Sequence, residues 1–179
     1  MTTVPPLTLS AINALDRDAF IAALGGLFEG PPWIVAAAWA ERPFRSLADL
    51  HRALCHIMET AHPDHQVALL QAHPDLVGRA ALAGTLSPAS TGEQAAAGLD
   101  RLTPDDIATF TRLNQAYRLR FGFPFVICAR ENKKDSITAS FVARLHNTRD
   151  QEIATALGEV AKICALRLAD LIHDDRASA

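Results

Sequence analysis

Apolar residues recur every three to four positions along most of the chain, which is the spacing of an amphipathic helix. Only Phe123–Cys128 resembles a strand, and Pro124 removes a backbone donor there, so we expect an extended segment and not a central strand. The fold class is therefore predicted to be all-α: a single-domain helical bundle with one extended loop segment from about Phe123 to Cys128. The predicted helices are Leu9–Ala14, Asp18–Phe28, a helix starting at Trp33 after two prolines, one from Leu47 through Thr60, a short one carrying Val67, Leu69 and Leu70, one from Pro104 to about Phe121, Ser136–Leu145 and Arg149–His173.

Polar residues at the ends of these segments support their boundaries. Ser46–Asp49 has the form of an N-cap followed by an acidic third residue. Thr103–Asp106 supplies a cap, a proline at the first helical position and acids at the positive helix end. Gly122 is expected to end that helix. In His62–Asp64, the proline is expected to stop one helix and Asp64 to cap the next.

Length and charge limit the classes of function. The 179 residues, 49% hydrophobic and 21% charged, are expected to form one domain over 1–179. The net charge of −3 argues against nucleic acid as a partner, and no apolar run reaches the length of a membrane span. Cys55, Cys128 and Cys164 are widely spaced and odd in number, which is typical of reduced thiols. Without a signal-peptide pattern at the start, the expected location is cytoplasmic.

An Ala-His-Pro-Asp string occurs twice, at Ala61–Asp64 and Ala72–Asp75. The first copy is explained by its place between two helices. The second leads into a loop, where Pro74 fixes the backbone beside His73 and holds a titratable imidazole at the loop mouth. The sequence alone favours the second copy only modestly.

The same region contains residues that can bind metal, namely His62, Asp64, His65, His73 and Asp75. Their spacing lacks the pair of ligands four residues apart that one helix face requires, and prolines separate them. We therefore predict no metal.

Two further features carry candidate chemistry. Ser90-Thr91-Gly92-Glu93 matches a capping box, and a helix start there would turn Glu93 and Gln94 toward an anionic ligand from the first turn. Arg167 falls on the apolar stripe of the last helix, where a guanidinium needs a partner. That partner is either an internal carboxylate or an anionic ligand; Arg144 presents a weaker version of the same choice.

In this order the motifs resemble the 2-oxo-4-hydroxy-4-carboxy-5-ureidoimidazoline (OHCU) decarboxylase family of urate degradation. The resemblance extends from about Leu9 to Leu171. The Phe-Gly-Phe-Pro-Phe-Val-Ile run is its most distinctive part. The matching segments are Ala72–Leu76, Ser90–Ala95 with Ala97–Leu99, Tyr117 through Phe121–Cys128, and Ile163–Leu168 with Arg167.

The resemblance implies a cofactor-free, all-helical, homodimeric carboxy-lyase that converts OHCU to (S)-allantoin with loss of CO2. Urate oxidase and hydroxyisourate hydrolase are the implied pathway neighbours, and the small-molecule substrate is the implied partner. The resemblance assigns His73 as the catalytic histidine, and Glu93 is expected to share in proton transfer. The implied substrate-binding residues are Pro74, Ser90, Thr91, Gly92, Gln94, Phe125, Val126, Ile127, Cys128, Ala129 and Arg167.

Three alternatives remain open at this point. The chain could act on a related ureido or hydantoin acid, because the same pocket fits several planar amides. It could be a helical interaction module in which His73 and Glu93 only cap helices. It could also use a catalytic metal, which a chelator would reveal.

Overall fold

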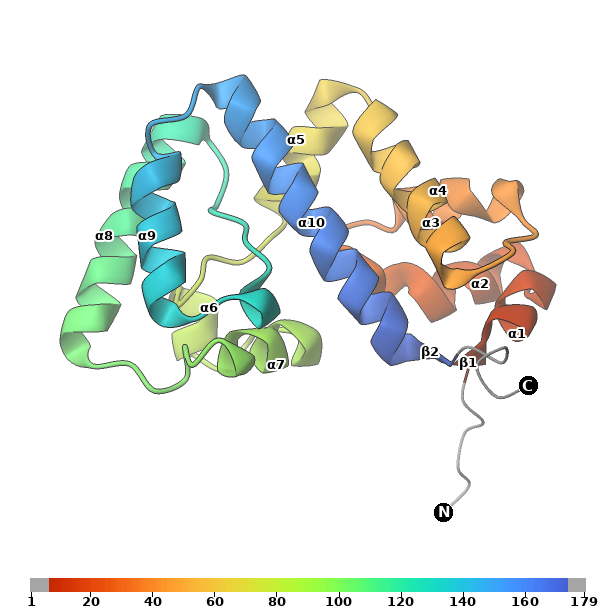
Figure 1. The fold of residues 1–179 in the computed structure, drawn as a ribbon, viewed down its shortest axis with the longest axis horizontal. Coiled ribbons are helices and arrows are strands. Elements are labelled where there is room, and N and C mark those ends of the chain that lie inside the picture. Colours follow the sequence, from red (N-terminus) through yellow and green to blue (C-terminus); the bar gives the residue numbers. More distant parts are fainter. Residues whose placement is uncertain (1–6, 174–179) are drawn as a thin grey trace, which may run out of the picture. The chain divides into compact units, whose positions relative to one another are not determined.

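The computed structural model describes residues 7–173, apart from the side chains at positions 79 and 80. Two compact units form: one comprises the chain up to residue 63 together with the part from 161 onward, and the other comprises residues 64–160. Figure 1 shows helices and turns throughout both units. The predicted all-α class is confirmed, whereas the single domain over 1–179 stays a prediction.

The first unit is built from short helices and part of the last long one. Three of its helices begin at the side-chain caps Thr8, Asp16 and Ser46, each of which accepts a backbone N–H three residues on. The core contains Phe20, Leu24, Ile34, Val35, Leu50, Leu54 and Met58. The elements are α1 (Leu9–Ala14), α2 (Arg17–Leu24), η1 (Gly25–Leu27), α3 (Trp33–Ala38), η2 (Trp39–Glu41) and α4 (Leu47–Thr60).

A short parallel pair of strands also lies in the first unit, which the helical periodicity did not predict. Strand β1 (Leu7–Thr8) pairs with β2 (Ile172–His173), with Leu7 opposite Ile172. The helix predicted to reach His173 therefore ends at Leu171, because the last two residues turn to pair with β1.

The second unit holds all the predicted site segments except Arg167. Helices α8 (Pro104–Phe121) and α9 (Lys134–Arg144) lie side by side (Figure 1) and meet through Phe110 and Phe141, whose ring centroids are 6.1 Å apart. Thr103 caps α8 as predicted and forms a capping box with Asp106, and Gly122 ends the helix at φ +82°. The elements are α5 (Pro63–Gln71), α6 (Arg79–Leu82), α7 (Pro88–Ala96), α8 (Pro104–Phe121), η3 (Ala129–Glu131), α9 (Lys134–Arg144) and α10 (Arg149–Leu171), of which α10 continues into the first unit.

Two predicted helix starts are wrong by part of a turn or more. Helix α5 begins at Pro63, so Asp64 lies inside its first turn and does not cap it. Helix α7 begins at Pro88 with Ser87 as its N-cap. Ser87 lies three residues before the predicted cap Ser90, and it starts the helix because the proline that follows it suits the first helical position.

The extended segment from Phe123 to Cys128 is confirmed, since it forms neither helix nor strand. Its residues are buried against the aromatic cluster of α8 and α9. Phe125 stacks on Phe141 with ring centroids 3.7 Å apart, and Tyr117 meets the Phe125 ring edge-on at 5.3 Å. Within residues 7–173, none of the helices combines the length and apolar character needed to cross a membrane.

Candidate active site

His73 lies directly after α5 and is buried, with 9% of its surface exposed. Its Nδ1 is 2.9 Å from the carbonyl oxygen of Leu69. Because a carbonyl only accepts hydrogen bonds, Nδ1 carries a proton, so the neutral form of the ring has its lone pair on Nε2. His62, the equivalent residue of the other Ala-His-Pro-Asp copy, is exposed at the start of α5. The two copies therefore occupy different environments, and only the second buries its imidazole.

The loop from His73 to Gly78 is held to α7 and α8 by side chains. Asn114 of α8 donates Nδ2–H to the Leu76 carbonyl at 2.7 Å, and Gln94 of α7 accepts the Val77 N–H at 3.1 Å. Arg118 of α8 binds Asp75 through Nε, at 2.8 Å and 3.1 Å from the two carboxylate oxygens. The backbone that follows His73 is thus fixed at consecutive positions.

The same loop contains strained and crowded backbone. Val77 has φ +53°, a left-handed conformation that a β-branched residue rarely adopts. A conformation of this kind costs on the order of 1–3 kcal/mol and persists only where its surroundings enforce it. Gly78 approaches Asp75 so closely that an added Cβ would lie 2.6 Å from the Asp75 Cβ. His73 and Pro74 lie at the start of this constrained loop.

Helix α7 places the Ser90–Gln94 motif differently from the capping box that its sequence suggests. Ser87 accepts the Ser90 N–H at 3.2 Å, so Ser90 is the third helical residue, and Glu93 lies in the second turn and not the first. Ser90 and Gln94 are buried four residues apart on one face, with Glu93 half-buried beside them.

The other two motif residues of α7 lie on its solvent side. Thr91 is exposed and donates its hydroxyl to the Ser87 carbonyl, and Gly92 is also exposed. The substrate contacts expected of Thr91 and Gly92 stay predictions, as do those of the buried residues Ser90 and Gln94.

A buried polar network braces the extended segment. Arg144 donates to the Val126 carbonyl at 2.9 Å and to Glu152 at 2.8 Å, and its guanidinium lies 4.3 Å from the centre of the Phe125 ring. Glu152 is fully buried and also accepts from Tyr117. Arg144 thus serves as an internal ion-pair partner, the first of the two roles open to it in the sequence.

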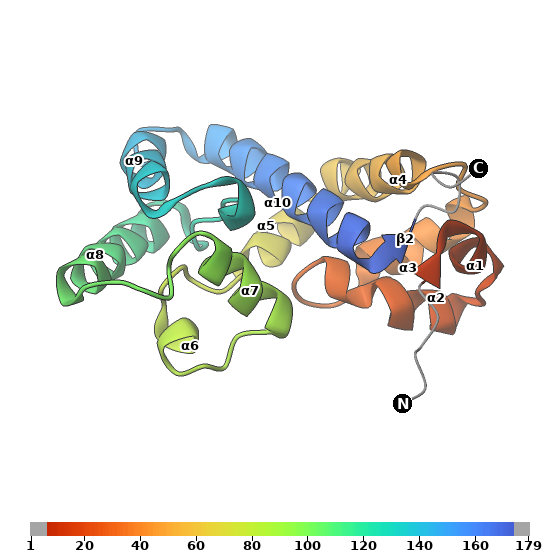
Figure 2. The ribbon, with the colours of Figure 1, turned by 60° about the horizontal axis from the view of Figure 1, so that its bottom comes forward.

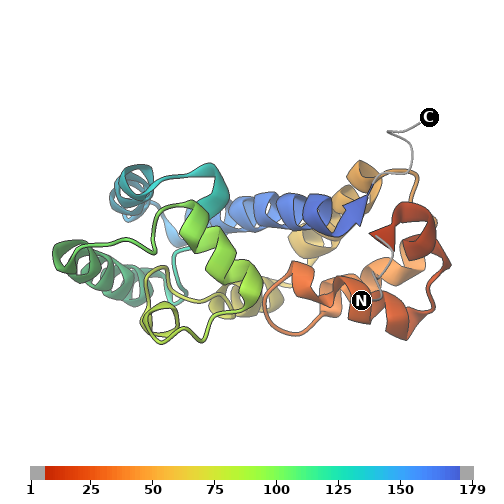
Figure 3. The same ribbon diagram turned by 90° about the horizontal axis from the view of Figure 1, so that it is seen from below.

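Helix α7 meets the turn that follows the extended segment. Burial raises the pKa of the Cys128 thiol above its ordinary value, and nearby carboxylates, among them Glu159 and Glu93, raise it further. Glu159 also accepts the Cys128 N–H at 2.8 Å, and Lys133 donates to the last-turn carbonyl of Ala96 at 2.6 Å. Figures 2 and 3 show α7 beside η3, the turn that directly follows this segment. Helix α7 therefore lies beside the end of the extended segment.

The second unit therefore brings three predicted motifs together. Gln94 connects α7 to the loop of His73 and Pro74, and α7 contacts η3, which begins at Ala129 at the end of the Phe125–Ala129 strip.

Arg167 lies in the first unit with a side chain 9% exposed, as its place on the apolar stripe predicts. It binds Glu29 at 3.1 Å and the Gly26 carbonyl at 3.2 Å, which supports the internal ion pair. Its ligand contact stays a prediction.

Two hollows in the second unit lie outside this set of predicted residues. One, of about 600 Å³, is lined by Asp75, Val77 and Gly78 on the loop side and by Asn114 and Arg118 of α8. Across the described residues, no three His, Cys, Asp or Glu side chains gather as a metal site would require. The absence of a cofactor was a prediction and stays one.

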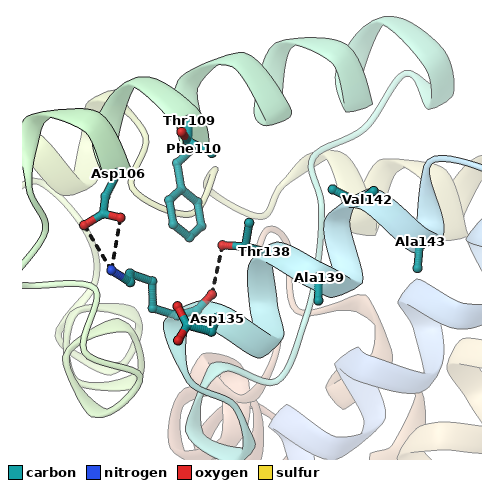
Figure 4. Close-up of a pocket in the computed structure, with 9 residues that line it drawn as sticks. Asp106, Thr109, Phe110, Asp135, Thr138, Ala139, Val142 and Ala143 are labelled. Atoms are coloured by element: carbon teal, nitrogen blue, oxygen red, sulfur yellow. Dashed lines mark hydrogen bonds and ion pairs between the residues drawn. The ribbon is translucent and has the colours of Figure 1, made fainter.

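The other hollow, of about 610 Å³, lies between α8 and α9 (Figure 4). Its polar groups bind one another: Lys134 contacts both carboxylate oxygens of Asp106, at 3.0 and 3.1 Å, and Thr138 donates to the Lys134 carbonyl. None of the predicted site residues lines it, so we exclude it from the candidate site.

Sequence reasoning missed three residues that shape the candidate site, namely Asn114, Glu152 and Glu159. Glu152 and Asn114 are polar residues at buried positions, and a polar residue on an apolar helix face is the one signal that would have indicated them. Glu159 follows the apolar stripe of α10 and gives no such signal.

Comparison with known proteins concerns the chain as a whole. Residues 13–169 match the family described as OHCU decarboxylase. The chain is 42% identical over 164 residues to the 2-oxo-4-hydroxy-4-carboxy-5-ureidoimidazoline decarboxylase of Haloferax volcanii, covering 92% of this chain and 95% of that protein. It is 37% identical over 167 residues to the uric acid degradation bifunctional protein PucL of Bacillus subtilis, covering 93% of this chain and 33% of the longer protein.

Among solved structures, the crystal structure of an (S)-allantoin synthase matches with a TM-score of 0.74 and 27% identity, covering 94% of this chain and 54% of that one. The sequence matches span nearly the whole chain, and the structural match shares its helical fold. The chain therefore belongs to the OHCU decarboxylase family of carboxy-lyases.

Proposed function

We propose that this protein decarboxylates OHCU to (S)-allantoin, with His73 as the catalytic residue and Glu93 sharing in proton transfer. The observation that carries the proposal is the Nδ1 contact between His73 and the Leu69 carbonyl, which leaves Nε2 as the basic nitrogen of a buried ring. The names of the relatives support the substrate and the product.

The substrate itself supplies the electron sink. Its carboxylate is attached to a carbon next to a C=N bond, so the electron pair of the breaking C–C bond moves into the ring as CO2 leaves. The resulting enol-enamine then takes a proton on carbon. The reaction requires a group to accept the hydroxyl proton or orient the carboxylate, which we assign to His73, and a group to share in proton transfer, which we assign to Glu93.

The remaining predicted residues hold the ligand in this proposal. Pro74 and Ser90 lie next to the two proposed acid–base groups, and Gln94 offers its amide N–H groups while its oxygen is bound to Val77. The backbone of the Phe125–Ala129 strip holds the ureido and ring amides by hydrogen bonds, while the buried Phe123 and Phe125 side chains exclude water and favour protonation on one face. The Cys128 N–H is bound to Glu159, so a substrate contact at that amide requires Glu159 to move or to share it.

The experiment generates OHCU in situ with urate oxidase and hydroxyisourate hydrolase, adds this protein, and follows allantoin by circular dichroism with and without chelator. We expect a rapid rise of the (S)-allantoin signal that chelator does not change. A trace equal to the spontaneous decay would reject the substrate assignment. A rate abolished by chelator and restored by metal would reject the cofactor-free mechanism.

We also infer that the enzyme is a homodimer, from the family resemblance, and that it is cytoplasmic, from the absence of a signal-peptide pattern in the sequence. The bifunctional relative named for uric acid degradation supports a place beside other steps of urate breakdown. Analytical ultracentrifugation at micromolar concentration tests the dimer directly, and a monomer mass would reject it.

A further inference from the structure

A single peptide unit in the His73 loop is held at both of its polar ends. The Leu76 carbonyl and the Val77 N–H belong to the same peptide plane. Asn114 donates to that carbonyl at 2.7 Å, and Gln94 accepts from that N–H at 3.1 Å. Rotating this plane would break both hydrogen bonds, so the two amide side chains fix its orientation.

Asn114 is an unusual residue for its position on α8. It is 6% exposed, and its Oδ1 has no hydrogen-bond partner. The orientation of its amide is set by the Leu76 carbonyl, which can only accept and therefore faces Nδ2. An unpartnered buried oxygen destabilises the folded state. The unpartnered oxygen of Asn114 thus destabilises the fold, while its amide N–H makes one hydrogen bond to the loop.

That hydrogen bond acts where the backbone is strained. Val77 follows the held carbonyl at φ +53°, and the chain runs back through Asp75 and the rigid Pro74 to His73. The Asp75 carboxylate is bound by Arg118, four residues after Asn114 on the same helix. A change in the Leu76–Val77 plane is therefore transmitted toward the imidazole over a few constrained residues.

We propose that Asn114 is a positioning residue: by locking the Leu76–Val77 peptide plane together with Gln94, it holds His73 in its reactive orientation. This inference rests on the proposed function of His73. Asn114 contacts the loop backbone and acts on the reaction only through it. A purely structural residue would instead affect folding and activity in parallel.

Three variants separate these roles. Asn114→Leu keeps the size of the side chain and removes both the donor and the unpartnered oxygen. Asn114→Asp keeps the shape but turns an acceptor toward the Leu76 carbonyl while ionised; when protonated, its O–H can donate. Gln115→Ala, which removes an exposed amide at the next position of α8, is the control.

For Asn114→Leu we expect kcat to fall by roughly tenfold to a hundredfold with little change in KM, because small misplacements of a reacting group have effects of that size. Its Tm is expected to stay within about 4 °C of the wild type, since the lost hydrogen bond and the removed unpartnered oxygen offset each other. The NMR titration of the His73 ring is expected to shift. Gln115→Ala is expected to match the wild type in all three measurements.

For Asn114→Asp the rate relative to the wild type is expected to rise as the pH is lowered, because burial raises a carboxyl pKa above its ordinary value of about 3.9 and the protonated group restores the donor. A folded Asn114→Leu variant with a wild-type rate would overturn the proposal. So would an Asn114→Asp rate whose ratio to the wild type is the same at every pH. A His73→Asn variant that kept full activity would instead reject the proposed function itself, so the two failures are distinguishable.

Discussion

Arg144 and Glu152 form a buried ion pair in which the Arg144 Nε lies 2.8 Å from the Glu152 Oε1. Glu152 is fully buried, and the Arg144 side chain is only 11% exposed. The pair is enclosed by Tyr117 and the Phe125 ring, and it reaches the extended segment through the Val126 carbonyl. The pair therefore joins α9 and α10 to the wall of the candidate site.

Breaking this pair on one side is expected to destabilise the protein. Glu152→Gln leaves Arg144 as an uncompensated buried charge, and such changes typically cost about 3–5 kcal/mol. Denaturant unfolding measures the loss. The double variant Arg144→Met/Glu152→Leu is expected to lose less folding stability than Arg144→Met and Glu152→Leu lose together as single variants, because no charge stays buried in the double variant. Additive losses would mean that the two side chains contribute independently.

The two Ala-His-Pro-Asp copies provide a matched pair of histidines. His73→Asn is expected to reduce kcat at least about a hundredfold, the usual effect of removing a general base, while far-ultraviolet circular dichroism stays unchanged. His62→Asn, at the exposed equivalent position, is expected to keep the wild-type rate. Equal rates for the two variants would remove His73 from the mechanism.

Gly78 is expected to tolerate no side chain. In Gly78→Ala the new Cβ would lie 2.6 Å from the Asp75 Cβ and 3.1 Å from the Asp75 carbonyl oxygen, so the loop must move. We expect a loss of activity together with a lower Tm. Gly158→Ala is the control, since a Cβ there meets nothing within 4 Å inside helix α10, and it is expected to stabilise by up to about 1 kcal/mol. An unaltered rate for Gly78→Ala would show that the loop position is not critical.

Asp106 contributes to the dependence of folding stability on pH in the acidic range. The Thr103 N–H, followed by Lys134 and the Thr103 hydroxyl, lowers the pKa of Asp106 below its ordinary value of 3.8. The stabilisation is present above that ordinary value. It is lost as the pH falls through the lowered folded-state pKa, because the unfolded chain binds the proton first. We expect Asp106→Asn to be less stable at neutral pH and to lose less stability on acidification below about pH 4. Parallel profiles for the two proteins would contradict this assignment.

The helices could be predicted from the sequence because their stop and start signals are local. Thr103 and Asp106 act within three residues of each other, Gly122 bonds to the carbonyl of Arg118 four residues before it, and the structure places each of them in its predicted role. The start of α7 was missed for the same reason: Ser87 and Ser90 both satisfy a local capping rule, and only the position of Pro88 separates them.

The candidate site required contacts between distant segments that no local pattern encodes. Asn114 reaches a carbonyl 38 residues away, and Arg144 braces a carbonyl 18 residues away. The family resemblance indicated His73 and Gln94, but not the residues behind them. A family resemblance identifies motifs in the sequence. The residues that hold those motifs in place are single buried polar residues, and their partners are known only from the folded structure.

The pairing of Leu7 with Ile172 also has a consequence for the order of folding. These strands are two residues each and come from opposite ends of the described chain. Pairing them closes a loop that contains almost all of that chain, and the few hydrogen bonds between two short strands offset little of the entropy lost. The pair is therefore expected to form last during refolding and to open first under mild denaturant. Amide protons at this pair are expected to exchange with solvent long before those of the α8 core.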